Sequence, residues 1–344
     1  MRQLRILLTG AGSPGGPGII KALLLNAPFE VYTCDADDFA SGRFLGQPFI
    51  QIPKADDENF IPFVLNFCIK NSIEVIFPLV TSELSYFAKQ KELFLQHGIR
   101  VIVSNYADLC IANNKGGLYQ HLVHNNIPVP HFKVVTKVKD LVEAAEQLGY
   151  PERPVCIKPT LSNGSRGVRI LQEEKSEFEL LLYSKPNHLY STLGHISQIL
   201  GERSFPELLI SEYLPGTEFT IDAIVQKGVP KLILPRSRTK INGGISVRGT
   251  FIKHDGIINY CDRILRSLNL SGPIGLQVKG DLNHQFKLLE INPRIQGTSV
   301  AALGVGINLP SLAIQQEFEA ITIDSSTIEW GTSFVRYYEE LYYK

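Results

Sequence analysis

The sequence lacks three features that would by themselves assign it to a class of protein. It has no apolar run of 18 residues, and the run in MRQLRILLTGAG at the N-terminus is too short for a signal peptide before its glycines begin. Its 34 basic and 34 acidic residues leave no net charge, so there is no electrostatic case for a nucleic-acid or anionic-membrane partner. Its five cysteines are dispersed and have no CxxC spacing, which argues against a zinc site or a disulfide framework. These absences predict a cytoplasmic protein that binds neither nucleic acid nor membrane.

The pattern of predicted strands and helices changes after about Asp108. A chain of 344 residues predicts two or three domains. In the first hundred residues apolar strands alternate with helices, which predicts a parallel sheet with helices on both faces. The strands are expected at 4–12, 30–37, 74–80 and 100–105, and the helices at 18–27 and 60–72. Beyond Glu207 strands dominate, with helices expected at about 259–269 and near 300–318. This later part predicts an α+β region with a mostly antiparallel sheet.

The first strand runs into the glycine-rich turn Gly10–Gly15, which matches GxGxxG, and Asp35 follows twenty residues after Gly15. This is the dinucleotide-binding pattern. Pro14 removes an N–H that would have faced a phosphate. Three interpretations stay open: NAD binding, a turn that packs the helix on the strand, and a loop that faces another ligand.

The segment LLEINPRIQG (288–297) places three chemically useful side chains on one face. In an extended chain Glu290, Asn292 and Arg294 point the same way. Gln277 lies thirteen residues before Glu290, across an expected hairpin with its turn at 282–285. Carboxylate and amide oxygens suit Mg²⁺, and a guanidinium suits a transferring phosphoryl group or an oxyanion. The alternative is a surface strand with a solvated ion pair.

Two lysines and a broken strand suit a nucleotide. Lys158 ends a strand before the glycine-rich loop at 162–167, and Lys115 opens a helix. Backbone N–H groups of such a loop and an ammonium both bind phosphate, although a hairpin turn and a solvated lysine explain the same residues. The Pro-Gly break after Leu214 leaves the backbone groups of 212–214 available to a flat heteroaromatic edge. Glu218 shares a strand face with Thr220 and Asp222, where a carboxylate suits a ribose hydroxyl; the alternative is a solvent-facing strand.

In this order the segments resemble the ATP-grasp superfamily, specifically the large subunit of carbamoyl-phosphate synthase and biotin carboxylase. The resemblance covers most of the chain, with the grasp module running from roughly Lys115 to Gly306. It implies an α/β and α+β fold in three parts: a Rossmann-like pre-ATP-grasp domain at 1–112, a small lid subdomain at 113–190 and a large subdomain with the metal site at 191–344. The chain has one grasp module, and it lacks the distinctive loop sequence of biotin carboxylases.

The resemblance also implies a set of nucleotide contacts. Lys115 and Lys158 would hold the ATP phosphates, and the backbone of the hinge would meet adenine, with Glu218 near ribose. The lid over the triphosphate would consist of Asn163, Gly164, Ser165, Arg166 and Gly167. The hinge would consist of Glu212, Tyr213 and Leu214.

For the metal, the resemblance implies Mg²⁺ or Mn²⁺ held by Gln277, Glu290 and Asn292, with Arg294 steadying the reacting acyl phosphate. Glutamine stands at the first metal position, as in the halves of the synthetase, where many relatives carry Asp or Glu. A neutral ligand there leaves the number of metal ions, one or two, open.

The function that follows is an ATP-dependent ligase, carbamoyl-phosphate synthase-like, that activates a carboxylate as an acyl phosphate for attack by an amine or related nucleophile. Arg238, Lys240 and Arg248 lie in a basic segment at 235–250 and are candidates to neutralise that carboxylate, unless the segment is simply a solvated loop. The expected partners are a small-molecule carboxylate and a nucleophile, and the oligomeric state is left open, with a homodimer considered. Two other functions stay open: an NAD(P)-dependent oxidoreductase that uses the N-terminal GxGxxG, and a nucleotide-binding protein without catalysis.

Overall fold

A computed structural model describes residues 3–25, 29–162, 164, 166–173, 178, 182–183 and 189–343. By their internal contacts the residues form two compact units. Unit 1 comprises Met1–Ala112, Glu218–Gln277 and Ile291–Lys344, and unit 2 comprises Asn113–Thr217 and Val278–Glu290. The three domains predicted from the sequence stay a prediction.

Unit 1 begins with a five-stranded parallel sheet in the order β3-β2-β1-β4-β5. Its strands are β1 (Leu4–Thr9), β2 (Phe29–Asp35), β3 (Phe49–Gln51), β4 (Val75–Pro78) and β5 (Arg100–Val101). Its helices are α1 (Gly16–Leu24), the 3₁₀ turn η1 (Ser41–Leu45), α2 (Phe60–Lys70), α3 (Thr81–Lys89), α4 (Lys91–Gln96) and α5 (Tyr106–Asn113). The alternation of strands and helices expected from the sequence is therefore present.

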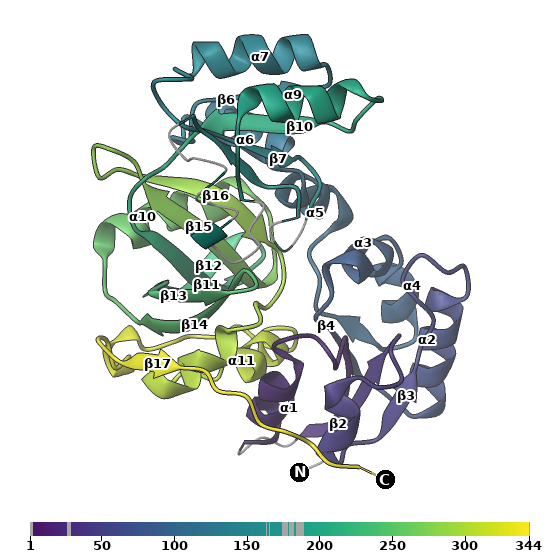
Figure 1. The fold of residues 1–344 in the computed structure, drawn as a ribbon. Coiled ribbons are helices and arrows are strands. Elements are labelled where there is room, and N and C mark those ends of the chain that lie inside the picture. Colours follow the sequence, from purple (N-terminus) through teal and green to yellow (C-terminus); the bar gives the residue numbers. More distant parts are fainter. Residues whose placement is uncertain are drawn as a thin grey trace. The chain divides into compact units, whose positions relative to one another are not determined.

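The strand β1 shows why this sheet is covered on both faces. Ile6 and Leu8 belong to one apolar cluster together with residues of α1. Leu7 points the other way, into a second cluster with residues of α2, α3 and α4. Figure 1 shows α1 on one side of the sheet and α2 on the other. A strand buried on both faces reads as a continuous apolar run, and residues 6–8 have this pattern.

The remainder of unit 1 follows residue 217. A four-stranded sheet has the order β12-β11-β15-β16, and a three-stranded sheet has the order β13-β14-β17. The strands are β11 (Glu218–Gln226), β12 (Val229–Ser237), β13 (Lys240–Asn242), β14 (Ile245–Thr250), β15 (Gly272–Gly280), β16 (Phe286–Asn292) and β17 (Ser333–Val335). The helical segments are α10 (Asp255–Ser267), η2 (Ser299–Val305), α11 (Leu309–Gln315) and η3 (Ser325–Thr327). The boundary between the two units falls within β15 and within β16.

One predicted helix, near 300–318, is in fact two segments. The 3₁₀ segment η2 ends at Gly306, whose φ of 80° is left-handed and favours glycine. Asn308 then caps α11, because its side chain accepts a hydrogen bond from the Ser311 amide. The apolar periodicity spans both segments, so it did not reveal the break.

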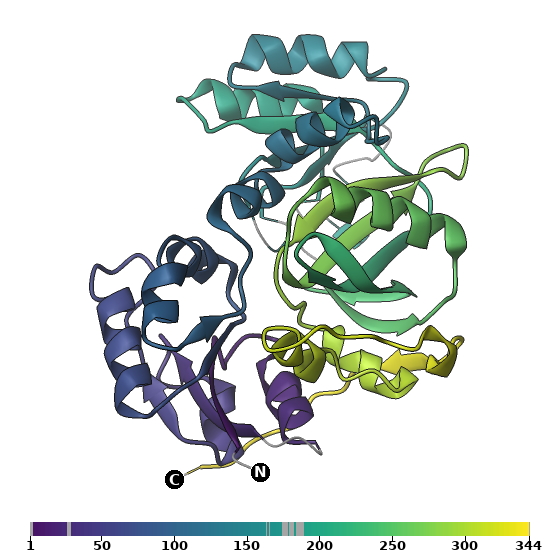
Figure 2. The ribbon, with the colours of Figure 1, turned by 180° about the vertical axis from the view of Figure 1, so that it is seen from behind.

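Unit 2 contains a five-stranded sheet in the order β6-β10-β7-β8-β9, with α7 and α9 packed beside each other in both views (Figures 1 and 2). Its strands are β6 (Phe132–Val135), β7 (Val155–Pro159), β8 (Arg169–Leu171), β9 (Tyr190–Ser191) and β10 (Leu208–Glu212). Its helices are α6 (Lys115–His124), α7 (Val138–Gln147) and α9 (Leu193–Gly201). Ile157 and Ile210 pack into one apolar cluster with α7 and α9, which marks the helix-covered face. Cys156, Lys158 and Ser211, at the alternate positions, therefore face the other way.

Candidate active site

Two lysines of unit 2 are buried close to the end of β16. Lys115 is 5% exposed, and its Nζ donates to the Ser162 carbonyl oxygen at 2.7 Å and lies 3.6 Å from Glu290 Oε2. Lys158 is 7% exposed, and its Nζ donates to the Leu289 carbonyl oxygen at 2.9 Å. Burial lowers the pKa of Lys115; Glu290 opposes this shift and the positive charge of Lys158 adds to it. Two ammonium groups beside one carboxylate leave an excess of positive charge that a polyanion would neutralise.

Local sequence explains why the two lysines are held in place. Asn114 caps α6, because its side chain accepts from the Gly117 amide, and so fixes Lys115 in the first turn. Tyr119, one turn later in α6, donates its hydroxyl to the Leu288 carbonyl oxygen at 2.6 Å, and its ring lies 5.4 Å from Lys158 Nζ. The ring thus offers its negative face to the ammonium group.

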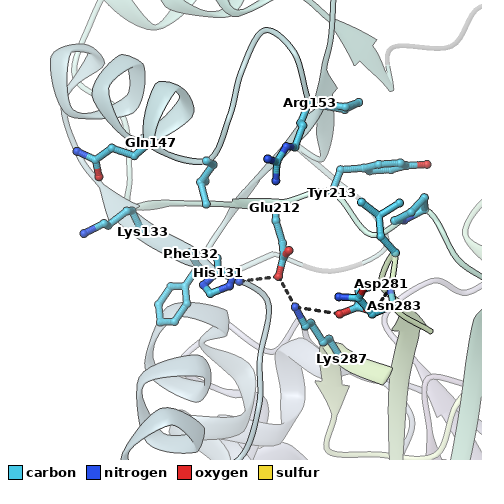
Figure 3. A pocket seen from close by; sticks show the side chains of 14 residues that line it. His131, Phe132, Lys133, Gln147, Arg153, Glu212, Tyr213, Asp281, Asn283 and Lys287 are labelled. Carbon is cyan, nitrogen blue, oxygen red and sulfur yellow. Dashed lines mark hydrogen bonds and ion pairs between the residues drawn. The ribbon is translucent and has the colours of Figure 1, made fainter. Parts of the chain in front are cut away.

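The predicted hinge lies at the end of β10. Glu212 Oε1 accepts from Lys287 Nζ at 2.7 Å and from the His131 amide at 2.9 Å, while Lys287 lies 3.3 Å from Asp281 (Figure 3). The Glu212 side chain is therefore engaged within unit 2, on the face covered by α7. The contact of the hinge backbone with adenine stays a prediction. The Tyr213 ring lies 4.9 Å from Lys279 Nζ.

A pocket of about 760 Å³ opens around the Glu212 side chain in unit 2. Gln147, at the end of α7, lies on one side of the pocket, and Asp281 and Lys287 lie opposite (Figure 3). This pocket lies on the α7 side of β10, whereas Lys158 is on the other face of the same sheet. The pocket is consequently distinct from the lysine pair.

The structure describes only part of the predicted lid. Gly164 and Gly167 have left-handed φ values of 62° and 74°, and a side chain at Gly167 would come within 2.7 Å of the Pro159 ring. Asn163 and Ser165 lie outside the described residues. Arg166 is exposed.

The predicted metal ligands occupy neighbouring strands. Gln277 is on β15 and belongs to unit 1, and its side chain is half-buried between two buried neighbours in the sequence. Glu290 and Asn292 are both half-buried on β16, the first in unit 2 and the second in unit 1. Carboxylate and amide oxygens are ligands that suit a hard cation such as Mg²⁺, and the assignment of these three residues to a metal stays a prediction.

Arg294 is fixed within unit 1. Its Nε donates to Thr81 Oγ1 at 2.9 Å, and its Nη1 donates to the Ile295 carbonyl oxygen at 2.8 Å. Thr81 opens α3 directly after β4, so the guanidinium lies at the carboxyl end of the N-terminal parallel sheet. Ligands of parallel α/β sheets bind at this end of the strands.

A buried network holds the segment that follows Arg294. Asp222 is 3% exposed; it accepts from Gln296 Nε2 at 3.0 Å and from Ser299, and its other oxygen accepts from Arg236 Nε at 2.9 Å. Thr220 on the same strand face is equally buried. The solvent-facing alternative for this strand is therefore wrong, because the polar face of β11 carries an internal ion pair.

Sequence reasoning missed Glu83, which, like Arg294, lies at the carboxyl end of the N-terminal parallel sheet. It is 6% exposed and accepts a short hydrogen bond from the Thr9 hydroxyl. Burial raises the pKa of Glu83 to about 7; the bond from Thr9 opposes this shift and the charge of Asp35 adds to it. The available signal was an acidic residue in the first turn after the apolar strand at 74–80.

The glycine-rich turn serves packing. Added side chains at Gly15 and Gly16 would come within 2.6 Å of Gly297 and 2.2 Å of the Ala11 carbonyl oxygen. The two oxygens of Asp35 accept from the amides of Gly12 and Asp37 at 2.8 and 3.0 Å. Asp35 is thus engaged with the turn itself, which does not favour the NAD(P) alternative.

The cations of the basic segment at 235–250 lie in different environments. Arg238 forms a short ion pair with Glu218, the predicted ribose contact, and also donates to Ser246 Oγ at 3.0 Å. Lys240 and Arg248 are register partners on β13 and β14, and both are exposed. Their assignment to the substrate stays a prediction.

Comparisons with known proteins agree with this architecture. Residues 204–335 match a family model described as ATP-grasp in the biosynthetic pathway with Ter operon, and residues 6–102 match the N-terminal domain of PylC-like proteins. The carbamoyl phosphate synthase large chain of Clostridium acetobutylicum is 21% identical over 230 residues, which is 64% of this chain and 20% of that protein. The chain thus spans about a fifth of the length of this curated relative.

Solved structures show the same fold. N5-carboxyaminoimidazole synthetase from Staphylococcus aureus, complexed with ADP, superimposes with a TM-score of 0.70 at 17% identity, covering 94% of this chain and 80% of that one. Biotin carboxylase from Campylobacter jejuni, in a β,γ-ATP complex, gives a TM-score of 0.70 at 15% identity, covering 96% and 74%.

The fold is therefore that of an ATP-grasp module preceded by a parallel α/β domain, and the predicted fold class is confirmed. The resemblance to ATP-grasp proteins that the motifs around Lys158, Glu212 and Glu290 indicated is confirmed by the family match over residues 204–335 and by these structural neighbours. Within the described residues, no helix is long and apolar enough to cross a membrane.

Proposed function

We propose that this protein is an ATP-dependent ligase that joins a carboxylate to an amine or related nucleophile, with release of ADP and phosphate. The observation that carries the proposal is the buried pair Lys115 and Lys158 near Glu290. Burial of two cations with one carboxylate is costly unless an anion is bound, and a triphosphate supplies the charge.

In the proposed reaction, a carboxylate oxygen attacks the γ-phosphorus of ATP. The new O–P bond forms as the bond to the β-phosphate bridging oxygen breaks, and ADP leaves. Lys115 and Lys158 would hold the phosphate oxygens in line, so that catalysis rests on positioning and charge stabilisation. A bound Mg²⁺ or Mn²⁺, held by Gln277, Glu290 and Asn292, would neutralise charge on the phosphates.

The nucleophile then attacks the acyl carbon of the acyl phosphate. The C–O bond to phosphate breaks, inorganic phosphate leaves and the nucleophile loses a proton. Arg294, held by Thr81 and the Ile295 carbonyl oxygen, would stabilise the oxyanion of the tetrahedral intermediate. Glutamine at the first metal position is the reason to propose chemistry of the carbamoyl-phosphate synthase kind.

The test is ADP release by the full chain, supplied with MgATP and mixtures of small carboxylates and amines. Lys158→Gln should abolish release, because it removes a buried phosphate contact. Lys139→Gln is the matched control, since Lys139 is exposed in unit 2 and pairs only with Glu143 among the described residues. Calorimetric titration with MgATP and with NADH separates the ligase from the oxidoreductase. Tight MgATP binding without ADP release over any mixture would favour a non-catalytic nucleotide-binding protein.

A further inference from the structure

A second, unassigned cavity of about 970 Å³ lies wholly within unit 1. It is formed by the turn between β11 and β12, the loop after α10, the residues after α11, and part of the α4–β5 region. The volume lies within the range of small-molecule sites. Lys115 and Lys158 both belong to unit 2, so the cavity is separate from the proposed phosphate site.

The charges around this cavity are unbalanced. It is lined by four cationic side chains and by two carboxylates, those of Glu317 and Glu319. The cations are Lys91, Arg100, Lys227 and Lys231. In a chain with no net charge, such a local excess of two positive charges is a feature of the cavity rather than of the whole surface.

Two of these cations have no partner among the residues that the structure describes. The ammonium groups of Lys227 and Lys231 make no ion pair or hydrogen bond with any residue that the structure describes. By contrast, Lys91 Nζ donates to the Val103 carbonyl oxygen at 2.6 Å, and the Arg100 guanidinium lies 4.8 Å from the centre of the Phe318 ring. Burial raises the pKa of Glu317, and the charges of Lys91 and Arg100 oppose the shift.

An independent observation comes from Gln316, which also lines the cavity. Its side chain is 5% exposed, yet neither Nε2 nor Oε1 has a hydrogen-bond partner within the described part of the chain. Its backbone carbonyl oxygen is satisfied by Gln226 Nε2 at 2.8 Å, so the residue is well placed and only the amide is left over. Buried polar groups are nearly always paired, and an orphaned amide calls for water or a ligand.

We propose that this cavity binds a small multivalent oxyanion, a molecule that carries phosphate groups or adjacent carboxylates. Lys227 would contact its oxygens from the β11–β12 turn, Lys231 from β12 and Arg100 from β5, and the Gln316 amide would hydrogen-bond to it. A monovalent anion would leave part of the positive charge unbalanced. The proposal does not depend on ligase activity, because no residue of the cavity belongs to the proposed catalytic set.

The test titrates diphosphate and citrate calorimetrically into the full chain at fixed ionic strength. The protein carries Lys158→Gln, so that the triphosphate site does not compete. Adding Lys227→Gln and Lys231→Gln should weaken binding by about tenfold or more. The matched control adds Lys70→Gln and Lys253→Gln, which remove two exposed lysines of unit 1 outside the cavity and should leave affinity unchanged. Equal weakening by both pairs, or no binding of either probe, would overturn the proposal.

Gln316→Leu gives a second test, because affinity for the anion should fall only if the amide contacts it. Leucine removes the orphaned polar atoms at similar volume, so the free protein should be at least as stable to heat. If the amide contacts the anion, affinity for diphosphate should fall by about fivefold or more. Unchanged affinity in a folded Gln316→Leu protein would overturn the assignment of the amide as a contact.

Discussion

The carboxyl group of Glu83 lies where water cannot hydrate its charged form. Its pKa is about 7 in the folded chain against an ordinary value of 4.5, with burial as the main cause. The folded state therefore binds the proton more tightly than the unfolded state. The stabilisation that this gives is complete below about pH 4.5, is lost as pH rises towards 7, and is absent above 7.

We expect Glu83→Gln to remove this pH dependence. Between pH 5 and pH 8 the free energy of unfolding of the wild type should fall relative to the variant by on the order of 3 kcal/mol. Urea unfolding of both proteins at several pH values measures the difference. If the free energy of unfolding changed with pH in the same way in both proteins, Glu83 would ionise normally in the folded chain. Glu30→Gln is a control, because the pKa of Glu30 is lowered by the bond from Arg5 and gives a slope only at lower pH.

At Arg294 the prediction concerns geometry rather than charge. Its Nε and Nη1 are held by Thr81 and Ile295, which leaves the planar group fixed. A lysine cannot make both contacts, and its ammonium is a compact point charge on a flexible stem. Arg294→Lys should therefore lower kcat by about a hundredfold and change the KM for ATP little. Steady-state kinetics with an identified acceptor measures this, with the exposed Arg266→Lys as control. A kcat within about twofold of wild type would remove Arg294 from the mechanism.

At the scale of elements, the hinge after β10 depends on one close backbone approach. The Gly216 amide donates to the Gly280 carbonyl oxygen at 3.0 Å, and a side chain at Gly216 would come within 2.7 Å of that oxygen. We expect Gly216→Ala to push the hinge away from β15 and to raise the KM for ATP several-fold. Gly194→Ala in α9 is the control, because a side chain there meets nothing within 4 Å and alanine favours the helix. Equal KM values for both variants would show that the hinge does not bind adenine.

The elements also show what a sequence can and cannot predict. Strands such as β1 and β7 were predicted, because a mostly apolar run shortly before a glycine-rich segment is a local signal. The pairing of Glu83 with Thr9, 74 residues away, was not, because nothing local joins them. For the same reason the ion pair of Arg238 with Glu218 was missed, although each residue was singled out for a different role. The lysines and the β16 motif could be singled out as candidates because each carries its chemistry within a few residues, and their roles stay predictions.

At the scale of the whole molecule, the proposed ligand set draws on distant stretches of the chain. Lys115 and Lys158 stand far before Gln277, Glu290 and Arg294 in the sequence. A ligand that binds the folded form but not the unfolded form stabilises the folded form by mass action. The stabilisation is about 2.7 kcal/mol at a free ligand concentration of a hundred times its Kd. MgATP should therefore raise the unfolding temperature of the wild type in a concentration-dependent way.

Glu290→Ala tests whether this stabilisation depends on the metal. The substitution removes the anionic member of the predicted metal set and the carboxylate 3.6 Å from Lys115, but no core packing, since Glu290 is half-buried. We expect a folded protein that forms no ADP and gains no added stability from Mg²⁺ over ATP alone. Glu143→Ala, which removes an exposed carboxylate paired with Lys139, should behave as wild type in both measurements. If Glu290→Ala retains both ADP formation and the Mg²⁺-dependent shift, the carboxylate is not a metal ligand. The metal would then have to be held by other oxygens of the chain.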